Sequence, residues 1–482
     1  MGKTGIVWLR QDLRTADNPA LTRAAEVCDR VVPVYIYAPE ESGDWPPGAA
    51  SRWWLHRSLE SLSASLVRLG SGLILRRGPI AAELIALADQ VNATHVFWNR
   101  LYEPAHAARD KKLAMTFQSE GLIVQTFNAS LLFEPWEQQR QDGGPYKVFT
   151  PFWKACTRRG LPADPIPAPP RLPPLPAGLS SEPLAALKLL PSVRWDSGLE
   201  ATWRPGEESA WGRLEHFLQK ALTDYQENRD RPDLEGTSRL SPHLHFGEIS
   251  PRQIVAAVKT HLHKLPKATL QSAAEGFLRQ LGWREFSYHL LYHFSKTPTE
   301  PLDVRFTRFP WPSVPSAVLQ AWQRGRTGIP IVDAGLRQLW STGWMHNRVR
   351  MLVASFLTKH LLIPWQEGAR WFWDTLVDAD LANNTQGWQW VAGCGADAAP
   401  YVRIFNPVLQ GLKFDPQGDY VRRWVPELGK MPAAWIHQPW KAPAEACQNA
   451  GLRLGKDYPM PIVDLAISRE RALSLFEQMR RK

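Results

Sequence analysis

The chain has 482 residues, of which 44% are hydrophobic and 22% charged, and its formal net charge is +10. This length exceeds the roughly 250–300 residues that one hydrophobic core serves, so two domains are expected. No run approaches the roughly 18 apolar residues of a membrane span, and the N-terminus lacks the pattern of a secretory signal. We expect a cytoplasmic monomer that does not enter a membrane, and its basic charge suits a polyanionic partner.

Cysteine and tryptophan usage narrows the class further. The four cysteines are far apart and form no CxxC pair, which argues against a zinc ribbon and leaves any iron–sulfur cluster to be assembled by the fold alone. We expect reduced thiols and no metal site. The 23 tryptophans are more unusual, because so many indoles indicate packing, stacking or redox use.

Residues 1–130 alternate short apolar runs with helical patterns. Strands are predicted at 5–9, 30–37, 72–75, 94–98 and 121–127. Helices are predicted at 19–27, 50–69, 80–90 and 105–119. This order indicates βαβ units, and hence an α/β domain with a Rossmann-like parallel sheet. No GxGxxG follows the first strand, so the usual dinucleotide fingerprint is absent.

The remaining chain divides into a linker and a helical domain. Residues 131–205 include the proline-rich run Pro162-Ala-Asp-Pro-Ile-Pro-Ala-Pro-Pro and are predicted to be an interdomain linker. Residues 206–482 are predicted to form a mostly α-helical domain, since β-branched runs are scarce there. Its predicted helices are 210–228, 251–262, 271–292, 331–341, 346–361 and 369–376.

Two segments of the helical domain carry candidate anion and metal ligands. In Glu235-Gly-Thr-Ser-Arg-Leu-Ser-Pro, the hydroxyl groups and a helix start could form an anion site, although an ordinary helix cap is the simpler interpretation. Further on, Glu285, His289 and His293 share one helical face. A metal site is conceivable there, but packed histidines are favoured.

Two later segments offer polar side chains at helical spacing. Asn347 and Met351 are four residues apart and are predicted to line one face of a helix. A basic helix that packs through its methionines is the alternative. Asp378 and Asp380 could be acid–base groups, metal ligands, or acceptors for sugar hydroxyls and a flavin ring edge.

These four segments, in this order, closely resemble the photolyase/cryptochrome family of flavoproteins. The N-terminal Trp8-Leu-Arg-Gln-Asp-Leu-Arg and the run Arg403-Ile-Phe-Asn-Pro-Val-Leu extend the resemblance over nearly the whole chain. The resemblance implies FAD in the helical domain and a light-driven carbon–carbon lyase that repairs cyclobutane pyrimidine dimers in DNA.

The resemblance also assigns residues to the flavin. The phosphates and ribityl chain would be held by Tyr225, Thr237, Ser238, Arg239, Leu240 and Ser241. The ring and adenosine side would be contacted by Arg284, Asp378 and Asp380, with Arg350 pairing with Asp378. Asn384 matches the position that faces flavin N5, where an amide favours the reduced flavin.

Other positions match an electron relay and a lesion pocket. The family photoreduces its flavin through three tryptophans, which match Trp388, Trp365 and, after a one-residue insertion, Trp311. The pyrimidine dimer, flipped out of the duplex, would pack against two indoles beside two further pocket residues. These four match Trp283, Trp390, Asn347 and Met351. Enzymes for (6-4) photoproducts have histidines at the last two positions, and Asn and Met cannot donate protons as those histidines do, which favours the cyclobutane substrate.

The resemblance also assigns DNA contacts, and at one position this chain differs from the family pattern. Positions that contact DNA phosphates match Arg229, Arg348, Arg403 and Lys413. Cyclobutane-dimer enzymes usually have glutamate three residues before Trp283, where this chain has Gln280. An amide cannot supply a proton or a negative charge there, which puts the repair efficiency in question.

Two further expectations concern the antenna chromophore and the alternative functions of the chain. Residues 48–59 and 394–401 look most like the class III bacterial subgroup, which favours methenyltetrahydrofolate over 8-hydroxy-deazaflavin as antenna, with Glu40 and Tyr401 as contacts. A cryptochrome photosensor is the alternative function. Its usual C-terminal extension is not expected here, and the retained pocket favours repair. A DNA-binding module without chemistry would bind no flavin.

Overall fold

A computed structural model of the chain describes residues 2–264 and 268–481. The chain forms two compact units, each assembled from several segments. The first comprises Met1–Thr223, Ser238–Ser295 and Val377–Ala382, and the second comprises Asp224–Thr237, Lys296–Leu376 and Asn383–Lys482. The domain boundaries expected at residues 130 and 205 stay a prediction.

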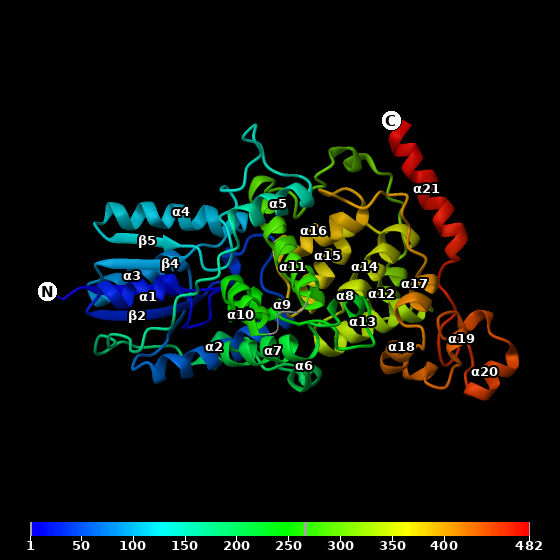
Figure 1. Ribbon diagram of the computed structural model, residues 1–482, viewed down its shortest axis with the longest axis horizontal. Helices are drawn as coiled ribbons and strands as arrows, with labels where there is room; N and C mark the ends of the chain where they lie inside the picture. The colour runs from blue at the N-terminus through cyan, green and yellow to red at the C-terminus, as the bar shows by residue number, and fades with distance from the viewer. Residues whose placement is uncertain (1, 265–267, 482) are drawn as a thin grey trace. The chain divides into compact units, whose positions relative to one another are not determined.

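A five-stranded parallel sheet lies in the first unit, with the strand order β3-β2-β1-β4-β5 (Figure 1). Its strands are β1 (Thr4–Leu9), β2 (Arg30–Tyr37), β3 (Ile74–Arg77), β4 (His95–Asn99) and β5 (Ile123–Phe127). The chain moves outward in one direction from β1 to β3 and then returns to add β4 and β5 on the other side. This doubly wound order confirms the predicted Rossmann-like sheet.

Four α-helices lie between the strands along the chain, and three of them pack on the sheet. The four are α1 (Pro19–Val27), α2 (Ala49–Arg68), α3 (Ile80–Val91) and α4 (Pro104–Ser119). The Asn18 side chain caps α1 by accepting from the Leu21 amide. Helix α1 packs on β1 and β4, α3 on β2, and α4 on β5. The core between them contains Val34, Leu84 and Phe117, all fully buried, because parallel strands are covered on both faces.

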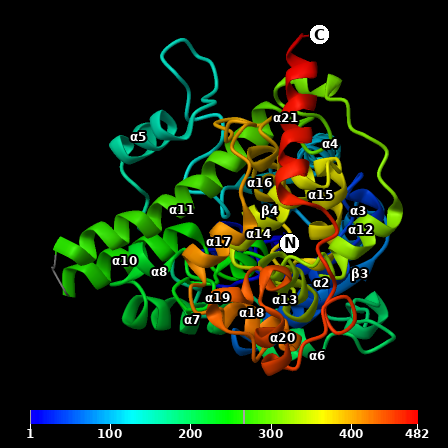
Figure 2. The ribbon, with the colours of Figure 1, turned by 90° about the vertical axis from the view of Figure 1, so that its right-hand side faces the viewer.

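Further helices complete the first unit. They are α5 (Phe149–Arg159), α6 (Ser197–Thr202), α7 (Glu207–Lys220), α9 (Ser241–His245), α10 (Pro251–Lys264) and α11 (Ala268–His293), with the 3-10 turns η1 (Pro39–Glu41) and η2 (Leu184–Leu187). Figure 2 shows α10 and α11 side by side, and α5 also packs on α11. Gly282 permits this last approach, because a Cβ there would lie 2.4 Å from the Trp153 ring.

The second unit is mostly helical in its described residues, with one isolated β-bridge between Leu454 and Tyr458. Its α-helices are α8 (Tyr225–Asn228), α12 (Ser316–Gln323), α13 (Pro330–Thr342), α14 (Asn347–Ser355), α15 (Trp365–Thr375), α16 (Leu381–Ala392, which begins in the first unit), α17 (Pro407–Phe414), α18 (Asp419–Trp424), α19 (Ala433–Ile436), α20 (Ala444–Ala450) and α21 (Leu465–Arg481). Shorter turns are η3 (Val304–Arg308), the π-helical η4 (Phe356–His360), η5 (Pro426–Leu428) and η6 (Pro439–Lys441). None of the described helices is both long and apolar enough to cross a lipid bilayer.

Two predicted helices are each divided in the structure. The helix expected over 210–228 is α7 followed by α8, because α7 ends at Lys220 before a turn. The helix expected over 346–361 is α14 followed directly by η4. Within η4 the Thr358 hydroxyl donates to the Ala354 carbonyl, and a hydroxyl bond of this kind often accompanies a distorted helix.

Candidate functional site

Helix α11 presents Trp283 and Gln280 three residues apart. The Trp283 ring, partly exposed, stacks on Phe149 at the start of α5, with ring centroids 3.7 Å apart and planes 7° from parallel. The close approach of α5 at Gly282 therefore fixes one face of this indole. The Gln280 amide nitrogen donates to the carbonyl one turn earlier at 3.1 Å. The structure thus orients the aromatic ring that was predicted to contact a lesion.

A buried carboxylate in the same unit is Asp380. It accepts a hydrogen bond from the Tyr288 hydroxyl, and its Oδ2 lies 3.7 Å from His245 Nδ1. Burial alone would raise the pKa of Asp380, but interaction with His245, the charge of Arg284 and the hydrogen bond from Tyr288 hold that pKa well below its usual value. Asp380 is therefore an ionised acceptor, suited to the hydroxyl or N–H groups of a ligand.

The charge of Arg284 acts on this carboxylate. Its guanidinium donates to the Ser130 carbonyl at 2.7 Å and stands 4.9 Å from the Tyr288 ring centroid. The next residue, Glu285, is fully buried and accepts from the Leu132 and Phe133 amides. The pair therefore holds the segment after β5 against α11 and fixes the direction of the Arg284 side chain.

The predicted anion segment differs in detail from the expectation. Helix α9 begins at Ser241 and has five residues, and the preceding Leu240 provides no side-chain cap, so the expected hydroxyl cap was wrong. Arg239 has a φ of 51°, an uncommon value for a residue with a side chain. Backbone strain of this kind clusters at ligand sites.

In the second unit, helix α14 carries the two candidate pocket residues. Asn347 Nδ2 lies 3.9 Å from Met351 Sδ, which confirms that they share a face. His346 caps the helix, because its side chain accepts from the Arg348 amide. An amide and a thioether are neutral at any ordinary pH, so this face provides no proton donor of the imidazolium kind.

Two predicted phosphate contacts meet at one aromatic ring. The Arg348 guanidinium lies 4.5 Å and the Lys413 amine 5.1 Å from the centroid of Phe414. Arg348 also pairs with Asp230 at 2.8 Å. Helices α14 and α17 therefore bring two cations together, although the sequence separates them by 65 positions (413 − 348).

Other predicted residues of this unit are more dispersed. The Arg229 guanidinium lies 5.5 Å from the centroid of Tyr225, and the Arg350 Nε donates to the Met345 carbonyl at 2.8 Å. Arg403 is exposed. Pairing of Arg350 with Asp378, and the assignment of Tyr225 and Arg350 to a flavin, stay predictions.

The predicted relay has a tightly packed inner part. The Trp388 ring is buried, with centroids 5.0 Å from Phe372 and 6.4 Å from Trp322. Gly368 permits this packing, because a Cβ there would lie 2.0 Å from the Trp388 ring. Trp365, also buried, lies one turn before Gly368 on α15, the helix that packs against Trp388 through Gly368.

Polar and aromatic contacts also fix neighbouring positions. Asn384 donates from Nδ2 to the Ala369 carbonyl at 3.0 Å, which orients its amide. Trp311 is partly exposed and packs against Phe309 at 4.5 Å. Trp390 is also partly exposed.

The two predicted antenna contacts have unlike surroundings. Glu40 in η1 is exposed, whereas Tyr401 is 4% exposed and stacks on Phe476 at 4.6 Å. The buried Lys359 of η4 donates from Nζ to the Tyr401 carbonyl at 2.9 Å. Both assignments to an antenna rest on the resemblance alone. Sequence reasoning missed Lys359, whose one signal was a lysine within an apolar run.

The histidines of α11 have backbone partners. His289 accepts from the Tyr146 amide at 3.0 Å through Nε2, and its Nδ1 lies 3.0 Å from the Pro135 carbonyl. Burial lowers the pKa of His289 to about 4, so it is neutral. His293 reaches the same carbonyl. Across the described ranges, no cluster of three or more His, Cys, Asp or Glu side chains is arranged to hold a metal ion.

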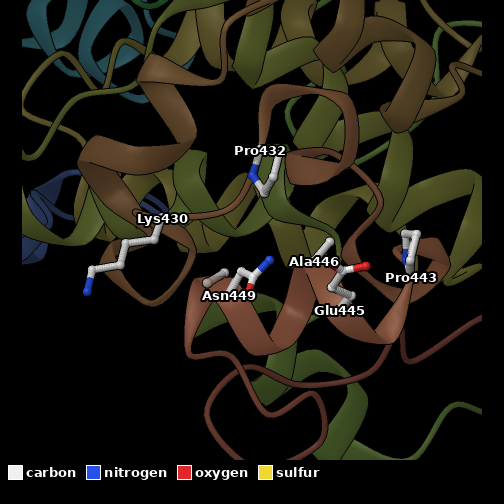
Figure 3. Close-up of a pocket in the computed structure, with 7 residues that line it drawn as sticks. Lys430, Pro432, Pro443, Glu445, Ala446 and Asn449 are labelled. Carbon is white, nitrogen blue, oxygen red and sulfur yellow. The ribbon is translucent and has the colours of Figure 1, made fainter.

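A pocket of about 260 Å³ lies elsewhere in the second unit (Figure 3). Glu445, Ala446 and Asn449 of α20 line one side, and the Lys430 side chain extends away from it (Figure 3). It contains none of the residues that sequence patterns or the resemblance singled out. We therefore do not associate it with the candidate site.

Comparison with known proteins covers the whole chain. Residues 5–171 match the family model described as DNA photolyase, and residues 277–478 match the FAD binding domain of DNA photolyase. A deoxyribodipyrimidine photo-lyase of Agrobacterium fabrum is 47% identical, with 99% of this chain and 98% of that protein covered. Cryptochrome-1 of Arabidopsis thaliana is 40% identical, with 99% and 71% covered. The crystal structure of a bacterial class III photolyase from Agrobacterium tumefaciens has a TM-score of 0.96 and 46% identity, and covers 100% of this chain and 98% of its own.

Proposed function

Because the chain belongs to the photolyase and cryptochrome family, we propose that it is a light-driven lyase that repairs cyclobutane pyrimidine dimers in DNA with FAD. The observation that carries this proposal is the 47% identity, over nearly the whole of both chains, to a deoxyribodipyrimidine photo-lyase. The residues that the resemblance assigns to a lesion pocket and to DNA contacts are consistent with it.

The positions that the resemblance assigns to FAD carry residue types suited to it. A flavin with its pyrophosphate and ribityl chain needs cations, hydroxyls and carboxylates in one protein. The first unit supplies Ser238, Arg239, Ser241, Arg284, Asp378 and Asp380. The second supplies Tyr225, Thr237, Arg350 and Asn384. When bound and reduced, FAD supplies an electron on illumination that splits the two ring bonds of the dimer and then returns.

The choice of lesion follows from neutral side chains. Trp283 and Trp390 offer partly exposed aromatic surfaces to the apolar side of a cyclobutane dimer. Asn347 and Met351 contact each other and cannot transfer a proton, whereas repair of a (6-4) photoproduct requires a proton donor. Gln280 donates a hydrogen bond within its own helix and carries no charge, so it can assist a dimer carbonyl only as an amide.

DNA binding is assigned to exposed and half-buried cations. Arg348 and Lys413, which flank Phe414, would each neutralise a phosphate, and Arg229 and Arg403 would add contacts. Phosphate contacts of this kind position a duplex without reading its sequence. This suits an enzyme that must recognise a lesion in any sequence context.

Two assignments complete the proposal. Trp388, Trp365 and Trp311 would carry electrons from the surface to the flavin and so keep it reduced. An antenna chromophore, methenyltetrahydrofolate in preference to 8-hydroxy-deazaflavin, would gather light through contacts with Glu40 and Tyr401. Extraction and absorption spectroscopy of the purified protein would identify the antenna.

The deciding experiment illuminates the reduced protein with an oligonucleotide that contains one cyclobutane thymine dimer. We expect restored thymines in light and none in the dark. A flavin-containing protein that binds this DNA but restores no thymine would instead be a photosensor of the cryptochrome kind. A protein without flavin absorbance would contradict both functions.

A further inference from the structure

Three aromatic rings of the first unit form a path between the protein surface and Asp380. Trp136 is 38% exposed, and its ring centroid lies 6.2 Å from that of Tyr102. Tyr102 is 4% exposed and lies 6.2 Å from Tyr288, which is equally buried. The Tyr288 hydroxyl donates to Asp380. None of these three rings belongs to the tryptophan relay assigned above.

Each buried phenol on this path donates a hydrogen bond to a carboxylate. Tyr102 donates to Glu134 at 2.8 Å, and Tyr288 donates to Asp380. Arg100 holds Glu134 in place with an ion pair at 2.5 Å. This geometry matters because a phenol becomes strongly acidic when it loses an electron. A hydrogen-bonded carboxylate then takes the proton, so that a neutral tyrosyl radical forms.

Tyr401 provides a contrast within the same protein. Its hydroxyl is buried and has no hydrogen-bond partner among the described residues. If this phenol lost an electron, its proton would have no hydrogen-bonded acceptor in the described part of the chain. A carboxylate partner is therefore not found at every buried tyrosine, and the path is distinguished by two such phenols whose ring centroids lie 6.2 Å apart.

We propose that Tyr288, Tyr102 and Trp136 form a second electron route, which donates electrons inward from the surface toward the flavin. The inference rests on the proposed function, because its oxidant is the photoexcited flavin and its final reductant is a thiol in solution.

The route balances as follows in electrons and protons. Tyr288 loses one electron to the oxidant, and its hydroxyl proton passes to Asp380. Tyr102 then passes one electron to Tyr288, which recovers its proton, while the Tyr102 proton moves to Glu134. Trp136 then passes one electron to Tyr102, which recovers its proton from Glu134. The exposed indole radical is reduced by the thiol. The net result is one electron from the thiol to the flavin, while the thiol releases its proton to solvent and the resulting thiyl radicals combine in pairs to form a disulfide.

The test uses the full-length flavoprotein with Trp365→Phe, which interrupts the tryptophan relay. Under flash illumination we expect a neutral tyrosyl radical in the electron paramagnetic resonance spectrum, with slower formation in D₂O. Under continuous light with a thiol, we expect slow residual reduction of the flavin. Adding Tyr102→Phe should remove the residual reduction, and adding Glu134→Gln should remove the Tyr102 radical while leaving the ring spacing intact.

Tyr458→Phe is the matched control. Tyr458 is a fully buried phenol that donates to a carboxylate, Asp333, at 2.6 Å, but it lies in the second unit and outside the path. The Tyr458→Phe substitution should leave the tyrosyl radical and the residual flavin reduction unchanged. The route is refuted if the Trp365→Phe protein, with flavin bound and repair by chemically reduced protein intact, gives no tyrosyl radical. It is also refuted if Tyr102→Phe has no more effect than Tyr458→Phe. Absence of flavin or of repair in the unsubstituted protein would refute the proposed function instead.

Discussion

Gly368→Ala should displace the inner tryptophan of the relay. The added Cβ would lie 2.0 Å from the Trp388 ring, whereas carbon atoms pack comfortably at about 3.5 Å or more. The indole must therefore move by about 1.5 Å (3.5 − 2.0). Phe372 and Trp322 pack against the same ring at 5.0 and 6.4 Å between centroids, so it has little room.

The magnitude follows from two opposing effects. Alanine is favoured over glycine in a helix by about 1 kcal/mol, and overpacking a well-packed core costs about 1–3 kcal/mol. The net loss in unfolding free energy is thus up to about 2 kcal/mol. A displaced ring also changes the distance that an electron crosses, so flavin photoreduction should slow.

Gly387→Ala is the matched control, because Gly387 lies on α16 next to Trp388 and a Cβ there meets nothing within 4 Å. We expect it to raise the unfolding free energy by about 0.5–1 kcal/mol and to leave photoreduction unchanged. Denaturant unfolding and the rate of flavin reduction under blue light measure both quantities. If Gly368→Ala proves as stable as Gly387→Ala and photoreduces at the same rate, the packing argument is wrong.

Three further predictions test other parts of the protein. Trp365→Phe should remove most flavin photoreduction but spare repair by chemically reduced protein; loss of both would contradict the relay assignment. Arg348→Ala and Lys413→Ala should each lower the salt dependence of DNA binding by about 0.9 in log–log slope, whereas Arg480→Ala on α21 should not. Burial raises the pKa of Glu285 to about 7 from 4.5, so its stabilising contribution is present below about pH 4.5 and is lost as pH rises through 7. Denaturant titrations should show that Glu285→Gln flattens this fall, and an unchanged pH profile would count against the burial effect.

The sheet could be predicted from sequence because its strands are short apolar runs separated by helical patterns. The edge strand β3 shows the limit, since it was expected at 72–75 and runs Ile74–Arg77. The prediction ended the strand before Arg76 and Arg77 because they are charged. An edge strand, however, tolerates charged side chains that an interior strand does not. The π-helical turn η4 could not be predicted from the sequence either. A change of hydrogen-bond register over one turn leaves the spacing of apolar residues almost unchanged.

The candidate site was predictable where spacing decides geometry. Asn347 and Met351 meet because they are four residues apart on one helix. Contacts across the fold were not predictable in this way: Tyr288 and Asp380 are 92 positions apart, and nothing local links them. The family resemblance supplied roles for individual side chains, but not the phenol–carboxylate pairs, which appear only once the chain is folded.

The discontinuous assembly of the two units affects how the chain can be synthesised and divided. The first unit is finished only by Val377–Ala382, so during translation it cannot be complete until about four-fifths of the chain has left the ribosome (382 of 482). A single protease cut cannot release either unit, because the polypeptide passes from one to the other five times. We therefore expect split halves expressed separately to remain incomplete, and nascent chains to depend on protection from aggregation until late in synthesis.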